Sequence, residues 1–218
     1  MTGGEYYNAM VDAVRSHGNY FKATQLDGSS FADPKFQYAI GETAAAVGDE
    51  SKLCRRGLLH FSDVPAETLV GGWWPCRLFE VAPSAIIAGE AHKYGAKSLT
   101  VVRELPSWLA LGPNGRVVAQ FIQEDATLGY AARHAARRAA GSAAGSAARY
   151  AAWHAARRAA GSAARARDAA WGAGRALVVA DLIAPEQFAT LYAPFSTVLP
   201  LEELRKRAVA AFPLTVQP

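Results

Sequence analysis

Short runs in which apolar residues alternate with polar ones dominate the first 125 residues. They are rich in aromatic and β-branched residues and are bounded by glycine, proline, aspartate and serine, which is typical of β-strands. Six such runs predict strands, at 20–25, 36–41, 57–62, 77–82, 98–105 and 116–121. Before the last run, the motif GPNG at 112–115 predicts a tight hairpin turn, because Asn-Gly accepts a positive φ.

Helical signals are fewer in this part of the chain. The run EYYNAMVDAVRS predicts a short helix over 5–16. The proline that opens PAETLV at 65–70 favours a helical turn, and the segment 90–97 is expected to form the turn between two strands. These elements predict an α+β domain over residues 1–125, with a mostly antiparallel sheet and short helices.

A different pattern, dominated by alanine, fills residues 126–180. The phrase YAARHAARRAAGSAA at 130–144 returns as YAAWHAARRAAGSAA at 150–164, twenty residues later. Because alanine and arginine are both strong helix formers, the pattern predicts an alanine-rich helical repeat array. Two geometries stay open: a hairpin that turns at GSAAGS, and a single long helix. We favour the hairpin, because a lone rod leaves Trp153 and Trp171 without packing partners.

The last segment, 181–218, is apolar again and predicts a helical cap. Pro185 suits the first turn of a helix, and Phe188, Leu191 and Tyr192 give that helix an apolar face. Since the terminal units of a repeat need a closing surface, this segment is expected to close the array. The chain is therefore predicted to have three parts, at 1–125, 126–180 and 181–218.

Charge is distributed unevenly along the chain. Residues 126–176 contain nine arginines and one aspartate, a net charge of +8; the whole chain carries +4, so the remainder carries −4. Arginines on a helix can contact phosphates, which makes five of them candidates for binding nucleic acid or an acidic partner. These are Arg133, Arg137, Arg138, Arg157 and Arg158. In the other interpretation, they keep an alanine-rich helix soluble, and the alanine faces favour self-association.

Cysteine usage and hydropathy restrict the class of protein. Cys54 and Cys76 form neither a disulfide framework nor a metal-binding spacing, so we expect reduced thiols in a cytoplasmic protein. The sequence contains no signal peptide pattern and no run of about 18 apolar residues, so no membrane association is expected. His134 and His154 lack a third ligand nearby, and no metal site is predicted.

Several short motifs follow one another in order between residues 20 and 105. They are YFKA at 20–23, FQYAIGE at 36–42, LC at 53–54, GLLH at 57–60, FEV at 79–81 and VREL at 102–105. This ordered set resembles an uncharacterised domain family of phages and bacteria. Members of that family often carry a low-complexity repeat array and a short closing segment after the domain. The resemblance therefore implies the same organisation here, and it implies no activity.

The segment GLLHFSD, followed by a short helix and the RLFEVA strand, carries a second resemblance. It is similar to the GFIHFS segment of small proteins with an ADP-ribosyltransferase-like fold, in which an NAD cleft lies between two small sheets. The resemblance implies that His60 and Ser62 contact the nucleotide. It also implies that Glu80 or Glu104 is the acid that stabilises the ribosyl cation. In the other interpretation, His60 is a half-buried strand residue and both glutamates lie on solvated faces.

The leading interpretation is a non-enzymatic binding or assembly module of phage or prophage type, because a strong repeat accompanies no convincing catalytic set. This interpretation requires no cofactor and implies a protein partner that the sequence does not identify. The first alternative is an ADP-ribosyltransferase-like enzyme that uses NAD. The second is nucleic-acid binding through the arginine-rich array.

Overall fold

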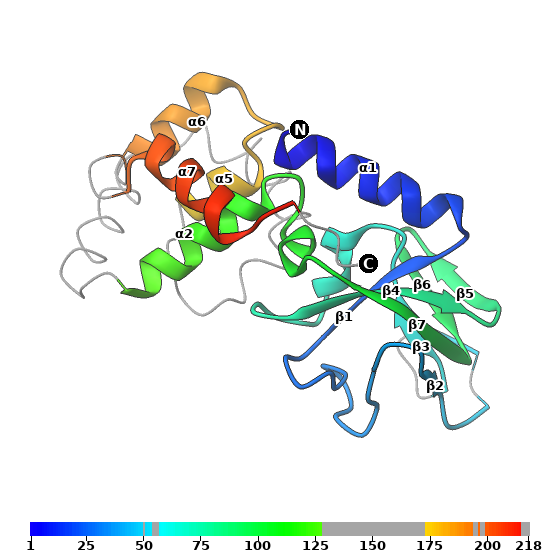
Figure 1. Cartoon of the computed structure of the whole chain (residues 1–218). Helices are drawn as coiled ribbons and strands as arrows, with labels where there is room; N and C mark the ends of the chain where they lie inside the picture. Colours follow the sequence, from blue (N-terminus) through cyan, green and yellow to red (C-terminus); the bar gives the residue numbers. More distant parts are fainter. Residues whose placement is uncertain (50, 54–56, 128–172, 194–195, 197–198, 215–218) are drawn as a thin grey trace.

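The computed structural model of the chain describes residues 1–49, 51–53, 57–127, 173–193, 196 and 199–214 (Figure 1). It contains strands and helices in one α+β arrangement. The strands are β1 Tyr20–Thr24, β2 Thr43–Ala45, β3 Leu59–Phe61, β4 Arg77–Pro83, β5 Ile86–Glu90, β6 Lys93–Ala96 and β7 Ser98–Leu105. The helices are α1 Gly3–Ser16, α2 Gly115–Thr127, α5 Ala173–Val178, α6 Pro185–Tyr192 and α7 Leu201–Ala211, with 3₁₀ turns η1 Pro65–Leu69 and η2 Ser107–Leu111.

The strands form two small antiparallel sheets. One sheet has the order β1-β4-β7-β2, and the other has the order β3-β6-β5. The two sheets meet where Phe21 of β1 and Ser62 exchange backbone hydrogen bonds of 2.7 and 2.9 Å. Apolar side chains from both sheets, including Phe61, Phe79 and Leu99, share one buried cluster. We call this cluster the inter-sheet core.

A β-bulge between β4 and β7 decides which way the side chains of β7 point. Glu80 of β4 lies opposite Arg103, but the next residue of β4 lies opposite Val101, so Val102 is the extra residue. The alternation of side chains restarts after Val102. As a result, Val101 packs in the inter-sheet core, whereas Arg103 turns to the other face and contacts helix α1. Glu104 lies on the face of the inter-sheet core.

Helix α1 covers the outer face of the four-stranded sheet (Figure 1). A capping box fixes its start: Thr2 Oγ1 accepts a 3.1 Å hydrogen bond from the Glu5 backbone, and the Glu5 carboxylate accepts one of 2.6 Å from the Thr2 backbone. Its buried residues recur at helical spacing and join the main apolar core. They are Tyr6, Tyr7, Met10, Val11 and Val14.

Helices α2, α5, α6 and α7 gather beside the sheets (Figure 1). Phe121 of α2, Leu177 of α5 and Leu204 of α7 are buried in the same apolar core as helix α1. The described part of 181–218 therefore packs on α2, and α2 itself crosses the predicted boundary at 125. Most of the array that this segment was expected to close, residues 128–172, lies outside the described residues. Within the described part, no helix is long and apolar enough to cross a membrane.

The predicted strand at 116–121 is wrong, because this segment lies in helix α2. Val118, Phe121 and Ile122 pack into the main core at positions i, i+3 and i+4, which is helical spacing. The GPNG motif is accordingly not a hairpin turn. Gly112, with φ at 91°, ends η2, and the Asn114 carbonyl accepts the first hydrogen bonds of α2.

Two further predictions need correction. The segment 36–41 is not a strand; it forms an isolated bridge between Gln37 and Ser29 within a folded loop. The segment 90–97 is more than a turn, since it contains strand β6 and the tight connection at Ala91 and His92 that joins it to β5. The loop at 36–41 is nevertheless anchored, because Tyr38 is buried in the inter-sheet core.

The other predictions in the described residues are confirmed with small changes of length. These are the helix at 5–16, the strands at 20–25, 57–62, 77–82 and 98–105, the helical turn at 65–70 and the helix start at Pro185. The α+β class is confirmed with them. Of the predicted array, residues 128–172 lie outside the described residues, and with them the choice between hairpin and single helix; its last described part contains α5.

Candidate ligand-binding site

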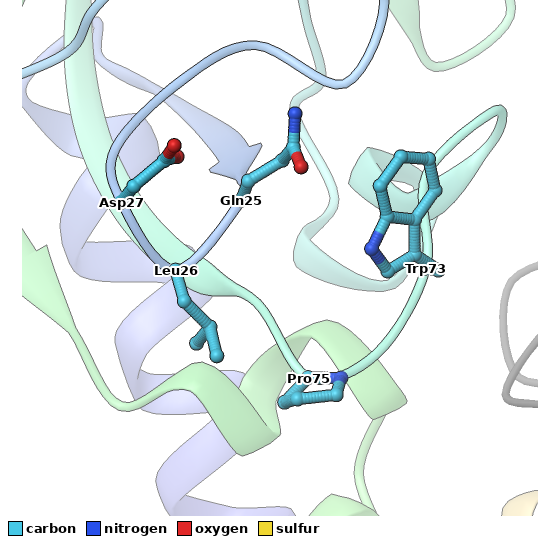
Figure 2. A pocket seen from close by; sticks show the side chains of 5 residues that line it. All are labelled: Gln25, Leu26, Asp27, Trp73 and Pro75. Carbon is cyan, nitrogen blue, oxygen red and sulfur yellow. The ribbon is translucent and has the colours of Figure 1, made fainter. Parts of the chain in front are cut away.

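A pocket of about 290 Å³ opens where strand β1 ends and strand β4 begins (Figure 2). Its lining residues come from two segments, Gln25 to Asp27 and Trp73 to Pro75. The pairing of Thr24 with Arg77 explains why these segments meet. In an antiparallel pair, the residues that follow one strand lie beside those that precede the other, so the ladder holds the two walls together.

The wall after β1 is fixed by a tight turn. The carboxylate of Asp27 accepts a 2.9 Å hydrogen bond from the Ser29 backbone, and hydrogen bonding with Ser29 holds the pKa of Asp27 below its usual value. Gly28 takes a φ of 85° in this turn, and a Cβ there would lie 3.0 Å from the Tyr38 carbonyl. Gln25 donates its side-chain amide to the Ser30 carbonyl at 3.2 Å. The turn therefore presents an ionised carboxylate beside an amide.

The opposite wall includes one of two adjacent tryptophans, whose side chains point in different directions. Trp74 is 9% exposed and belongs to the main core, whereas Trp73 is 41% exposed and lines the pocket. Phe31 meets the Trp73 ring edge to face at a centroid distance of 4.6 Å. Gly72 permits this contact, because a Cβ at that position would lie 2.7 Å from the Phe31 ring. The buried neighbour and the Phe31 contact thus hold an exposed indole in place.

A second group of polar residues lies where the two sheets meet. Lys22 of β1 donates a 2.8 Å hydrogen bond to the backbone carbonyl of His60, and its ammonium lies 5.3 Å from the centre of the Tyr38 ring. Burial and the charge of Lys93 lower the pKa of Lys22 to about 8. Burial, followed by the charges of Lys93 and Lys22, lowers the pKa of His60 to about 4. His60 is therefore a neutral imidazole at physiological pH.

Glu80 is 1% exposed and lies on the face of the sheet that α1 covers. One carboxylate oxygen accepts a 2.6 Å hydrogen bond from the Asn19 side chain, and the other accepts one of 2.6 Å from Arg103 Nε. His17 Nδ1 lies 4.0 Å from the first oxygen. Both oxygens of this buried acid are thus occupied by donors from the protein.

Ser62 and Glu80 lie on either side of Phe21, which pairs with both, but their side chains have different hydrogen-bond partners. Ser62 is buried, and its hydroxyl accepts a 3.0 Å hydrogen bond from the Val64 backbone. Glu104 lies on the opposite face of the sheet from Glu80, and Arg77 binds both of its oxygens, at 3.0 and 2.6 Å. The structure therefore places His60 on β3 and Ser62 directly after this strand, whereas the hydrogen bonds of both glutamates go to other residues.

The arginine candidates of the array, Arg133, Arg137, Arg138, Arg157 and Arg158, all lie outside the described residues. Among the residues that are described, no group of three or more histidine, cysteine, aspartate or glutamate side chains could hold a metal ion. Cys76 is a buried free thiol, and burial raises its pKa to about 12. Cys54 lies outside the described residues.

Sequence reasoning missed the pocket that Trp73 and Asp27 line. The signal that could have indicated it is the pair of adjacent tryptophans in GGWWP, since two large rings next to each other in an irregular segment rarely point the same way. Comparison of the chain with protein-family models, with curated proteins and with solved structures finds no match. The function must therefore be argued from the geometry of the site.

Proposed function

We propose that this protein is a non-enzymatic binding or assembly module of phage or prophage type, which holds a protein partner at the pocket of Trp73 and Asp27. One observation carries the proposal: an exposed indole that packs against Phe31 lines the same pocket as an ionised carboxylate, at the end of a paired strand. Exposed aromatic side chains with their geometry fixed by packing are typical of residues that dominate binding energy.

The remaining parts of the chain take supporting roles in this proposal. The alanine-rich segment 126–180 is a helical spacer or a basic contact surface, and the module works in the cytoplasm. The buried, paired state of Glu80 supports a structural role for this acid, since a carboxylate whose two oxygens are already bonded has little capacity to stabilise a reacting group.

Panning of a random peptide library on the full chain tests the proposal. Peptides that bind the wild-type protein are counter-screened against Trp73→Ala and against Val70→Ala, which removes an exposed side chain outside the pocket. We expect binders that lose affinity with Trp73→Ala and keep it with Val70→Ala. If no binder depends on Trp73, the pocket is not the binding surface and the proposal fails.

A second candidate function is an ADP-ribosyltransferase-like enzyme that uses NAD. The observation in its favour is the junction of two small sheets at Phe21 and Ser62, with Lys22 and His60 beside it. Consumption of NAD by the wild-type protein, with its loss in a folded His60→Ala variant, would establish this candidate and overturn the non-enzymatic proposal. We expect neither NAD consumption nor a thermal shift on addition of NAD.

A further inference from the structure

The charged group of the pocket is negative. Asp27 presents a carboxylate, which accepts hydrogen bonds and carries a negative charge. Gln25 donates one of its two amide N–H groups to the Ser30 carbonyl, so it can offer an acceptor oxygen as well as its second N–H. The remaining lining residues, Leu26, Trp73 and Pro75, are apolar or aromatic. A ligand that fits this lining therefore supplies donors and positive charge together with a flat or apolar surface.

The indole of Trp73 supplies the strongest aromatic partner that proteins use for cations. In Figure 2 its ring lies across the pocket from Asp27, with Gln25 between them. Phe31 packs against the ring edge to face, and 41% of the residue stays exposed. A volume of about 290 Å³ is at the small end for ligand pockets, and it suits one side chain rather than a cofactor.

The protein already uses this combination of groups once, next to the pocket. The guanidinium of Arg77 lies 4.7 Å from the centre of the Phe79 ring and binds both oxygens of Glu104. The guanidinium of Arg77 is therefore paired with Glu104, and the negative charge of Asp27 can pair with a ligand. A planar guanidinium can stack on a ring and bond a carboxylate at the same time, which a lysine ammonium does less well.

From these observations we infer that the pocket of Trp73 and Asp27 binds the guanidinium group of an arginine in a protein partner. The guanidinium stacks on the exposed indole and donates hydrogen bonds to the carboxylate of Asp27. This inference rests on the proposed function and adds the chemical class of the group that is recognised.

Nuclear magnetic resonance of the full chain with ¹⁵N-labelled tryptophan tests the inference. The chain has five tryptophans, and the indole signal of Trp73 is the one that disappears in Trp73→Phe. The probe is the peptide acetyl-Gly-Arg-Gly-amide, and its partner is the same peptide with citrulline, which is nearly isosteric with arginine but uncharged. We expect the arginine peptide to shift the Trp73 signal with saturation, and the citrulline peptide to leave it in place.

Two matched variants test the role of the carboxylate. Asp27→Asn and Asp33→Asn both keep an oxygen that can accept the local backbone hydrogen bond, from Ser29 and from Lys35 respectively. Only Asp27 lines the pocket. We expect Asp27→Asn to weaken binding of the arginine peptide about threefold to fivefold, the effect of one exposed charge pair. Asp33→Asn should leave it unchanged.

The outcomes separate this inference from the proposed function. Equal shifts of Trp73 with arginine and citrulline, or equal effects of the two aspartate variants, would overturn recognition of a guanidinium while the pocket remained a binding site. If the arginine peptide leaves Trp73 unmoved while Trp73-dependent binders emerge from panning, the inference fails and the proposed function stands. Failure of both experiments would overturn both.

Discussion

The ion pair between Glu80 and Arg103 should contribute far more to stability than the pair between Arg77 and Glu104, although both join β4 to β7. The side chain of Glu80 is 2% exposed and that of Arg103 is 32% exposed, with 2.6 Å between the bonded atoms. The second pair has a similar distance of 2.6 Å, but its side chains are 30% and 40% exposed. The two pairs thus differ mainly in the burial of the carboxylate, although Arg77 binds both oxygens of Glu104 and Arg103 binds one oxygen of Glu80.

The size of the stability loss expected when each pair is broken follows from this difference in burial. At an effective dielectric constant of 20, unit charges about 4 Å apart attract by about 4 kcal/mol. Desolvation of Glu80 offsets part of this attraction in the intact pair. Without Arg103, the desolvation of the carboxylate is opposed only by the hydrogen bond from Asn19 and by His17 at 4.0 Å. Arg103→Met should therefore lower the free energy of unfolding by about 3 kcal/mol. This loss is a large part of the total free energy of unfolding of a protein whose stability is in the usual range.

Two double-mutant cycles measure the coupling within each pair. The first uses Glu80→Gln and Arg103→Met, and the second uses Glu104→Gln and Arg77→Met. Urea unfolding of the full chain supplies the free energies, with an unchanged m-value as evidence that the variants unfold in the same way. We expect a coupling of about 2–3 kcal/mol for the first pair and below about 1 kcal/mol for the second. Equal couplings would refute the reasoning from burial.

Three other predictions concern single positions. Gly72→Ala should lower the free energy of unfolding by about 1–3 kcal/mol, measured by urea unfolding, because the new Cβ would overlap the Phe31 ring. Cys76 should resist iodoacetamide in the native protein and react only after unfolding, as peptide mass spectrometry would record, since its pKa is about 12. The pKa of His60 is about 4 in the folded protein against 6.5 in the unfolded chain. Its contribution to stability is therefore present above about pH 6.5 and lost as the pH falls toward 4, so wild type should lose more stability than His60→Gln between about pH 7 and pH 5.

Local sequence patterns were sufficient for much of the sheet. The runs at 77–82 and 98–105 are rich in β-branched and aromatic residues, and both are strands. Helix 5–16 was predictable for a similar reason, since its preference is local. The run at 116–121 misled because Val117, Val118 and Phe121 suit a strand by type, whereas their spacing also suits a helix that packs on the main core.

The candidate acids show what a pattern of alternation cannot reveal. Glu80 and Glu104 were both candidate acids because the resemblance to proteins with an ADP-ribosyltransferase-like fold allowed either, and each lies in a predicted strand. The extra residue Val102 reverses the face of every later side chain in β7. Arg103 therefore lies on the face that simple alternation would give to Glu104, and Glu104 lies on the face that it would give to Arg103. A bulge depends on pairing with the neighbouring strand, which no single run of residues encodes. The separation of the two glutamates therefore required the structure.

The pocket also depends on the pairing of two strands, and this pairing fixes the positions of the groups that line it. Gln25 to Asp27 and Trp73 to Pro75 are far apart in the chain, and the pairing of Thr24 with Arg77 places them side by side. A shift of this register by one residue would place Phe21 and Leu78 on opposite faces of the sheet, and both could not stay in the main core, so the apolar core itself fixes the register. The distance between the indole and the carboxylate is then set by the fold before any ligand arrives. A preformed site of this kind loses little side-chain entropy on binding, which is what a small pocket needs to hold a single guanidinium group.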